Sequence, residues 1–462
     1  MDFGDTAHIS FTLGRTGGEP PFFGESTATV TLILGASFNR KYHGPGKLQA
    51  QEWRESMMEV GVSPCASVED LAAALNPIMH YFGGGFTDHD MARWSRTIEI
   101  PRMLAVRDNG DVVAGAGAFT FEMSVPGGTV PSAGVTVVGV LPTHRRRGIL
   151  RAMMRAQLDD IHRRGEPVAW LWASEETIYR RFGYGLSSLS GDVEIPSAAG
   201  EFERRFESTG VTRIVTEEEA FEPFSTVYEA VRRGQPGMFS RTPDWWKLRR
   251  LADSDRARAG GGGVLNRVLL TVDGEPRGYA LYRLHQSFES GISSGFLNVI
   301  EAIGSTLDAT RAIWRFLLDV DWVVHIKASL LPIDHPLLFL LARPRLMKMR
   351  LADALWVRLV DVPRALAART IAPAEPVVIE VSDHFCPWNE GRYRVAADGV
   401  ERTSAAPDLA LEVNALGSIY LGGFSFGQLA RAGHIEERRP GAASRADALF
   451  PRDRAPWCPE VF

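Results

Sequence analysis

Residues 135–154, VTVVGVLPTHRRRGILRAMM, place the tightest constraint on how this chain can fold. The stretch VTVVGV is rich in β-branched residues and predicts a strand. From Ile149 to Ile161 apolar residues recur at three- and four-residue steps, which predicts an amphipathic helix that ends at Gly165. Four cationic or potentially cationic residues, 144–147, stand at the turn between strand and helix. Their mutual repulsion costs stability unless something anionic binds there.

The turn predicts a phosphate site. A helix N-terminus has unpaired N–H groups and a partial positive charge, so arginines at this end make an anion site. The strings G-x-x-x-x-G-K-[ST] and G-x-G-x-x-G, which mark nucleotide-binding loops, do not occur in the chain. The chain instead has Arg145-x-x-Gly148 directly after a strand, for which a solvated basic turn is the alternative interpretation.

The neighbouring segments predict a mixed α/β domain. Strands are expected at 103–106, at 112–121 and in PVAWLWAS, and a short helix in EETIYRRFGYG. Ser67 is a plausible helix N-cap, so we expect the compact domain to begin near residue 60. Residues 1–59, with the turn-forming stretch GRTGGEPPFFGEST, are expected to form a poorly ordered extension.

Composition limits the function classes. A chain of 462 residues that is 45% hydrophobic is expected to form about three domains. A net charge of −5 argues against a nucleic-acid partner. Three scattered cysteines make neither a disulfide framework nor a zinc site, so no metal is expected. Neither a secretory signal nor a long apolar run is evident, which predicts a cytoplasmic protein without a membrane partner.

Several separated strings resemble one family. Arg145-x-x-Gly148 resembles the pyrophosphate-binding loop of the GNAT acetyltransferase superfamily, although Leu150 stands where that loop has a small residue. The strings PTHRRRGILRAMM, ASEETIYRRFGYG, WSRTIEIPRMLAVRD, GYALYRL, LWVRLVDVPRALAAR and LGSIYLGG resemble the Eis-like aminoglycoside acetyltransferases of actinobacteria. The resemblance covers about residues 60–462.

The resemblance implies an α/β and α+β multidomain chain that assembles as a homohexamer. Residues 60–196 would be a catalytic GNAT domain, 197–372 a second GNAT-like domain without a cofactor loop, and 373–462 a sterol-carrier-protein-like domain whose end enters the active site. The chain's own patterning agrees, because strands are expected again between residues 264 and 303, ahead of the helical stretch LDATRAIWRFLLD. No R-x-x-G precedes that helix.

The resemblance also assigns a site for acetyl-CoA. Strand residues would offer backbone groups to the pantetheine arm, and the basic turn would take the pyrophosphate. The implied cofactor-binding residues are Val138, Val140, Arg145, Arg146, Arg147, Gly148, Ser174 and Arg181.

Two residues would carry the chemistry, which is attack of an amine on a thioester. Tyr179 matches the family's general acid; Tyr184 is a competitor, and packing on the core is the alternative role for Tyr179. Phe462 would supply a terminal carboxylate that accepts the amine proton. Trp172 stands where the family often has a histidine thought to assist the base, so Glu175 is a further candidate.

The acceptor is the least constrained part. Trp94 matches a pocket tryptophan, and Asp88 and Asp90 on the same segment could attract a polyamine. Three hypotheses stay open: an N-acetyltransferase of small amines such as aminoglycosides or related polyamines, a protein lysine acetyltransferase, and a non-catalytic protein that binds coenzyme A or lipid.

Overall fold

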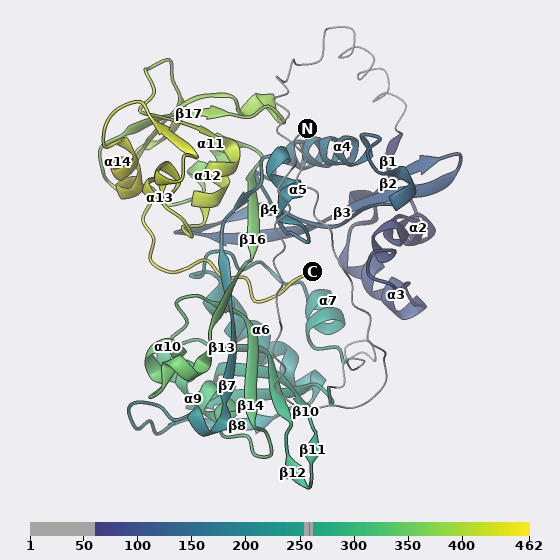
Figure 1. Cartoon of the computed structure of the whole chain (residues 1–462), viewed down its shortest axis with the longest axis vertical. Helices are drawn as coiled ribbons and strands as arrows, with labels where there is room; N and C mark the ends of the chain where they lie inside the picture. The colour runs from purple at the N-terminus through teal and green to yellow at the C-terminus, as the bar shows by residue number, and fades with distance from the viewer. Residues whose placement is uncertain (1–60, 254–257, 259–261) are drawn as a thin grey trace, which may run out of the picture. The chain divides into compact units, whose positions relative to one another are not determined.

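The computed structural model describes residues 61–253, 258 and 262–462. The extension predicted for residues 1–59 lies outside them. The described residues form two seven-stranded sheets, a five-stranded sheet and a two-stranded hairpin (Figure 1). The hairpin joins β11 (Phe288–Glu289) to β12 (Ile292–Ser293). No helix in this part of the chain is long and apolar enough to span a bilayer.

The first sheet contains the predicted strand–turn–helix. Its order is β1-β2-β3-β4-β5-β16-β6, and only β4 and β5 pair in parallel. The strands are β1 (Val62–Pro64), β2 (Leu104–Asp108), β3 (Asp111–Val125), β4 (Gly128–Val140), β5 (Val168–Trp172), β6 (Gly185–Leu186) and β16 (Leu355–Leu359). Helix α4 (Ile149–Arg163) connects β4 to β5, as the apolar repeat predicted.

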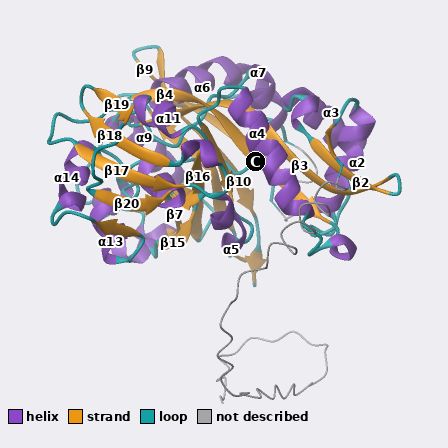
Figure 2. Cartoon of the chain, turned by 90° about the horizontal axis from the view of Figure 1, so that it is seen from above, coloured by secondary structure: helices purple, strands orange, loops and turns teal. Residues whose placement is uncertain are grey.

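Two further helices pack beside this sheet. Helix α2 (Val68–Met79) begins at Ser67, whose side chain accepts from the N–H of Asp70 and so caps the helix as predicted. Both α2 and α4 lie against β3 (Figure 2). Gly115 allows the close approach of α2, because a Cβ there would lie 1.9 Å from the carbonyl oxygen of Ala74. The neighbouring helices are α3 (Asp88–Thr97) and the single turn α5 (Glu176–Tyr179).

The second sheet repeats this arrangement, with order β15-β7-β14-β13-β10-β9-β8 and one parallel pair, β13 with β14. The strands are β7 (Leu189–Pro196), β8 (Val211–Ile214), β9 (Asn266–Val272), β10 (Glu275–His285), β13 (Phe296–Gly304), β14 (His325–Pro332) and β15 (Arg350–Asp353). Helix α9 (Leu307–Leu318) makes the crossover and starts at a Thr306 cap. The remaining helices are α6 (Glu217–Arg232), α10 (Leu337–Leu340) and α7 (Pro243–Trp245), which continues into a π-helical turn at Trp246–Arg250.

The two sheets exchange a strand. Residues 189–196 were assigned to the first domain, but β7 pairs with β14 in the second sheet. Residues 355–359 were assigned to the second domain, but β16 pairs with β5 and β6 in the first. Neither sheet is therefore formed by one continuous stretch of the sequence. The sequence missed this because an apolar pattern such as the fully buried LWVRL of β16 predicts burial and not a pairing partner.

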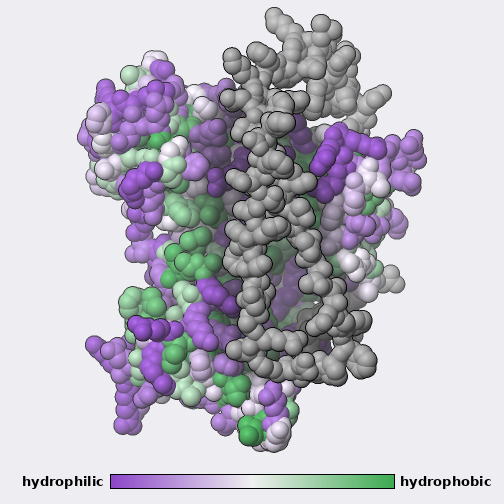
Figure 3. Space-filling model, viewed as in Figure 1, coloured by the Kyte–Doolittle hydropathy of each residue, from purple (hydrophilic) through white to green (hydrophobic). Residues whose placement is uncertain are grey.

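The C-terminal part is a smaller α+β domain. Its sheet has the order β19-β18-β17-β20-β21. The elements are α11 (Val362–Ala367), β17 (Val377–Ser382), β18 (Gly391–Ala396), β19 (Gly399–Arg402), β20 (Leu409–Glu412), α12 (Val413–Tyr420), α13 (Phe426–Arg431), β21 (Ile435–Glu437) and α14 (Ala442–Leu449). Helix α12 contacts β16 and β6, which ties this domain to the first sheet. Its surface is largely hydrophilic in Figure 3.

A buried ion pair stabilises the first domain. Arg102 donates to both carboxylate oxygens of Glu166, at 2.7 and 2.6 Å, and also to Thr120. The side chains of Arg102 and Glu166 are 1% and 7% exposed, so water does not screen their charges. Removing one partner would leave the other charge buried and uncompensated.

We expect Glu166→Ala to lower the free energy of unfolding by about 3 to 5 kcal/mol. Arg163→Ala is the control, because its pair with Asp160 is on the surface, and it should cost about 0 to 1 kcal/mol. Urea unfolding followed by circular dichroism measures both changes. Similar costs for the two variants would contradict this account.

Candidate active site

The site begins where β4 and β5 stop pairing. Their parallel pairs are Ser132 with Val168, Ala133 with Ala169 and Gly134 with Trp170, and none follows. Beyond this point β4 contains a bulge: its register against β3 shifts between Gly115 and Gly117, and Val137 has a φ of 48°. A bulge bends its strand and leaves one residue unpaired. The edges of β4 and β5 are therefore separated along residues 135–140, and two cavities lie there.

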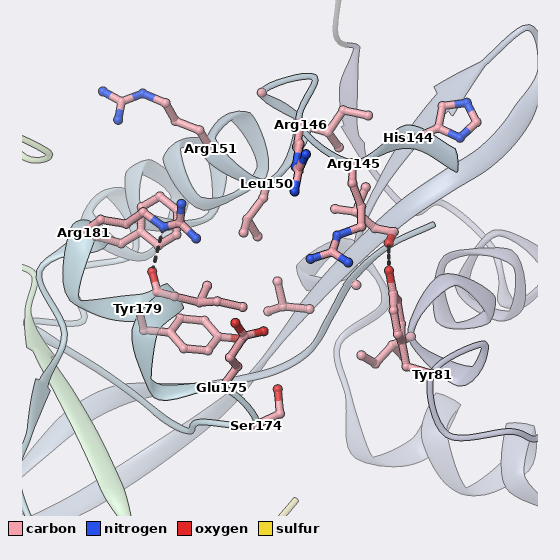
Figure 4. Close-up of a pocket in the computed structure, with 18 of the residues that line it drawn as sticks. Tyr81, His144, Arg145, Arg146, Leu150, Arg151, Ser174, Glu175, Tyr179 and Arg181 are labelled. Carbon is pink, nitrogen blue, oxygen red and sulfur yellow. Dashed lines mark hydrogen bonds between the residues drawn. The ribbon is translucent and has the colours of Figure 1, made fainter. Parts of the chain in front are cut away.

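The first cavity, about 660 Å³, is lined by the end of β4, the basic turn and the start of α5 (Figure 4). We call it the cofactor pocket. Seven of the eight predicted cofactor-binding residues line it: Val138, Val140, Arg145, Arg146, Gly148, Ser174 and Arg181. The side chain of Arg147 does not; it lies 3.6 Å from Asp108 and donates to the carbonyl of Thr143.

Two of the four basic residues of the turn contact another side chain of the protein, and the other two extend into the pocket. His144 and Arg147 both contact the carboxylate of Asp108. Arg145 and Arg146 make no ion pair with any described residue and extend into the pocket in Figure 4. Positive φ angles of 65° at Arg146 and 79° at Gly148 turn the chain into α4. Two unpaired guanidinium groups near a helix N-terminus suit an anion with several oxygens.

Tyr81 is a lining residue that the sequence did not reveal. Its hydroxyl donates a 2.7 Å hydrogen bond to the carbonyl of Val140 (Figure 4). The carbonyl of Val140, one of the predicted pantetheine contacts, is therefore already engaged. A tyrosine after a helix carries no sequence signal for such a contact, since the two residues are 59 positions apart.

The second cavity, about 850 Å³, is lined by both large sheets and by the end of the chain. We call it the acceptor pocket. It shares with the cofactor pocket the residues Ile78, Phe82, Val138, Ser174 and Tyr179. The two pockets thus meet at the hydroxyl-bearing side chains of Ser174 and Tyr179.

The residues predicted for the acceptor separate in the structure. Trp94 lines the acceptor pocket. Asp90 does not: its carboxylate accepts from the N–H and hydroxyl of Thr87 and pairs with Arg93. Asp90 therefore caps α3, and the assignment to the acceptor is replaced by this structural role. The structure describes the backbone of Asp88 but not its side chain.

Tyr179 has the environment of a proton donor. Only 6% of the residue is exposed, and its hydroxyl has no hydrogen-bond partner among the described residues. Burial, and then the charge of Glu175, raises the pKa of Tyr179 to about 12. The phenol is therefore neutral at physiological pH and still carries the proton that a general acid would donate. The competitor Tyr184 is fully buried and lines neither pocket.

Phe462 lies in the acceptor pocket. Its ring packs edge-on against Trp170 and Phe119, with centroids 4.8 and 5.5 Å away. Gly134 makes room for it, because a Cβ there would lie 2.9 Å from the Phe462 ring. Thr136 Oγ1 donates a 3.1 Å hydrogen bond to an oxygen of the Phe462 main chain. Thr136 is another contact that the sequence did not predict.

The residues before Phe462 are held by buried polar contacts. Trp172 Nε1 donates to the main-chain oxygen of Glu460 at 3.1 Å, so the residue that replaces the family's histidine tethers the tail. The Glu460 carboxylate lies 2.8 Å from Arg241 and accepts from Trp245. Burial lowers the pKa of Arg241, but the charge of Glu301 outweighs it and holds that pKa well above its ordinary value. Arg241 is thus a permanent cation that fixes Glu460.

Comparisons with known proteins agree with this geometry. Residues 66–187 and 237–359 each match the description "Acetyltransferase (GNAT) domain", and residues 362–459 match "Sterol carrier protein domain". An uncharacterized N-acetyltransferase of Streptomyces avermitilis is 40% identical over 402 residues, which cover 83% of this chain and 95% of the relative. The N-acetyltransferase Eis of Mycobacterium tuberculosis is 34% identical over 381 residues, 78% and 89% of the two chains. The crystal structure of Eis1 from Mycobacterium abscessus superposes with a TM-score of 0.77 at 36% identity, covering 87% of this chain and all of that one.

The chain is an Eis-like GNAT N-acetyltransferase. The predicted family, its three-domain fold class and its enzyme class are confirmed. The first GNAT domain carries the basic turn, whereas the second begins its crossover helix at Thr306 with no arginine beside the cap.

The cofactor pocket fits coenzyme A in its charges and backbone. The unpaired guanidinium groups of Arg145 and Arg146 suit a pyrophosphate. The part of β4 that no longer pairs with β5 presents Val138 to the same pocket. Its backbone groups are available there to hydrogen-bond the amides of a pantetheine arm, as a neighbouring strand would.

We expect Arg146→Ala to weaken coenzyme A binding by about 1.5 to 3 kcal/mol, roughly tenfold to 150-fold, because a charged hydrogen bond to phosphate is lost. Folding should be unaffected, since Arg146 makes no ion pair in the described chain. Isothermal calorimetry measures the affinity, and Arg163→Ala serves again as the surface control. Unchanged affinity in Arg146→Ala would remove this residue from the pyrophosphate site.

Proposed function

We propose that this N-acetyltransferase moves the acetyl group of acetyl-CoA to a primary amine of a small molecule held in the acceptor pocket. One observation carries the proposal: the two pockets share Tyr179 and Ser174, so a thioester in one can meet an amine in the other. When bound, acetyl-CoA supplies the acetyl group, whose C–S bond breaks as the C–N bond forms, while the amine loses a proton and the thiolate gains one.

The residues of the cofactor pocket bind acetyl-CoA and orient it. Arg145 and Arg146 hold the pyrophosphate, with the N–H groups around Arg147 and Gly148 at the start of α4. Val138 and Val140 on β4, with Ser174 after β5, line the path of the pantetheine arm. Arg181 is fixed by a hydrogen bond from its Nε to the carbonyl of Ile178 and adds a further cation. The resemblance implies these assignments, and the positions of Val138, Val140, Arg145, Arg146, Gly148, Ser174 and Arg181 in the pocket lining support them.

Tyr179 is the proposed general acid. A phenol is protonated at neutral pH even at its ordinary pKa, and burial raises the pKa of Tyr179 further, to about 12. A phenol positioned beside the sulfur can give its proton as the C–S bond breaks, and the phenolate left behind then regains a proton from solvent. The shared wall of the two pockets is the place where such a donor is needed.

The carboxylate of Phe462 is the proposed base. An ammonium must lose a proton before or as it attacks, and a carboxylate held beside the amine can accept it. Thr136 orients one oxygen of Phe462, and Trp172 together with the Glu460–Arg241 pair fixes the preceding residues. Glu175, which lines only the cofactor pocket, is the alternative base.

The acceptor class has three candidates. Aminoglycosides and related polyamines are the acceptors that the sequence resemblance implies. A protein lysine is a weaker candidate, because a tail anchored at Glu460 and Phe462 fills part of the pocket wall. Binding of coenzyme A or lipid without turnover is the third. A homohexameric assembly stays a prediction from the resemblance, and a cytoplasmic location stays a prediction from the composition of the sequence.

Replacement of Tyr179 by phenylalanine tests the function and the acid together. We expect thiol release from acetyl-CoA in the presence of an amine panel, and we expect Tyr179→Phe to lower kcat by about 10² to 10⁴. The affinity for coenzyme A should be unchanged, because the phenylalanine ring packs in the core as the tyrosine ring does. Absence of thiol release by the native chain with every amine would reject the transferase proposal, and an unchanged kcat in Tyr179→Phe would reject the acid.

Changes at Phe462 test the base. Adding a short peptide after Phe462 would convert the carboxylate to an amide, and deleting Phe462 would withdraw it by one residue. Each should lower acetyl transfer by about 10² or more while leaving coenzyme A binding intact, because Arg145 and Arg146 are untouched. Steady-state thiol release compares the three forms, with an N-terminal tag as the control. Equal rates in all three would remove Phe462 from the mechanism.

A further inference from the structure

The acceptor pocket is walled by arginines. Its charged side chains, among the described residues, are Arg93, Arg249, Arg250 and Glu460. The one carboxylate of this set, Glu460, is already paired with Arg241. The pocket therefore offers no unpaired side-chain carboxylate to an incoming cation within the described part of the chain.

The arginines differ in their partners. Arg93 pairs with Asp90 at 3.3 Å, and Arg250 pairs with Glu301 at 2.8 Å. Arg249 has no carboxylate partner among the residues described. Its Nε donates to the hydroxyl of Thr97 at 3.2 Å, while its Nη2 is buried without any hydrogen bond. Arg93 and Arg250 each also have a buried Nε without a hydrogen bond, but Arg249 is the arginine of this pocket that has no ion-pair partner among the described residues.

The surroundings of Arg249 make an anion favourable. Its guanidinium lies over the rings of Trp94, Phe119 and Trp245, at 4.6, 4.7 and 4.5 Å. Burial, and then the charge of Arg93, lowers its pKa to about 9. The group is still a cation at neutral pH; the charge of Glu460 partly opposes the lowering of its pKa, but no carboxylate of the described residues lies within ion-pair distance of it. A carboxylate placed against it would offset the cost of its burial and satisfy the free donors.

Most of the rest of the lining is apolar or aromatic; its polar members are Thr136, Ser174, Asn298, Ser329 and the hydroxyl of Tyr179. Phe86 and Trp94 from the first domain and Val299, Ile300 and Leu330 from the second sheet belong to this lining. Such walls favour a ligand with an apolar body rather than a sugar with many hydroxyls.

We propose that the acceptor is an amine that also carries a carboxylate and an apolar or aromatic body, with the carboxylate bound by Arg249. This inference rests on the proposed acetyl transfer and narrows its substrate class. A polycation is disfavoured, because each additional ammonium would approach the unpaired charge of Arg249 and find no free side-chain carboxylate there. The carboxylate proposed at Phe462 makes no ion pair with Arg249, so it does not already fill this role.

The experiment compares matched acceptors. Para- and meta-aminomethylbenzoic acid and an aminopentanoic acid are each tested against the corresponding amide, which keeps the amine and removes the charge. Kanamycin and spermidine represent polycations. We expect at least one acid to exceed its amide in kcat/KM by about tenfold to a hundredfold, the range of a charged hydrogen bond. We expect both polycations to be poorer than that acid.

Variants connect the preference to Arg249. In Arg249→Gln the ratio of acid to amide should fall to about one, and Arg249→Lys should keep part of it because the charge is retained. Lys247→Gln removes an exposed cation from the same helical turn outside the pocket and should keep the full ratio. Thermal unfolding checks that each variant is folded.

The outcomes separate the two proposals. Acetylation of amines with no preference for acids, or with polycations preferred, would overturn the inference and leave the transferase proposal standing. A preference that persists in a folded Arg249→Gln would overturn the role of Arg249. Failure to acetylate any amine in the panel would reject the proposed function itself.

Discussion

The separation of β4 from β5 after Gly134 and Trp170 is the constraint on which the rest of the site depends. Paired strands satisfy each other's N–H and C=O groups and leave no space between them. Here the bulge at Val137 ends the pairing, so the edge of β4 and the residues after β5 face cavities instead of each other. Both pockets lie along this gap, and the basic turn follows β4 because the strand leads directly into α4.

The end of the chain reaches this gap because buried charge holds it there. Terminal residues are usually frayed, since few contacts offset the entropy of ordering them. Glu460 contributes a carboxylate paired with Arg241, and Arg241 also pairs with Glu301 at 2.6 Å on the second sheet. Breaking such a pair would leave an uncompensated charge in the core. The aromatic ring of Phe462 then fills a cluster that includes Trp170.

The sequence predicted what is local and missed what depends on tertiary contact. The strand, basic turn and helix lie within thirty residues, and Arg145, Arg146 and Gly148 line the cofactor pocket as expected. The exchange of β7 and β16 was missed because their pairing partners lie more than about 125 residues away in the sequence, and no periodicity encodes such contacts. Arg249 was missed for a similar reason: in DWWKLRR it reads as an exposed basic residue, and only folding buries it among aromatic rings.

The two GNAT domains share a fold but contribute different parts of the site. Its parallel pair β13–β14 stops at Val299 and Ala328, as β4–β5 stops in the first domain. The residues that follow, Ile300 and Leu330, line the acceptor pocket, and Leu330 has a φ of 60°. Each domain therefore contributes a separated strand pair to the acceptor pocket. Only the first has a basic turn before its crossover helix, so the proposed phosphate site lies in the first domain, while the second contributes lining residues to the acceptor pocket. The second copy of the fold thus supplies part of the acceptor wall and has no basic turn of its own before its crossover helix.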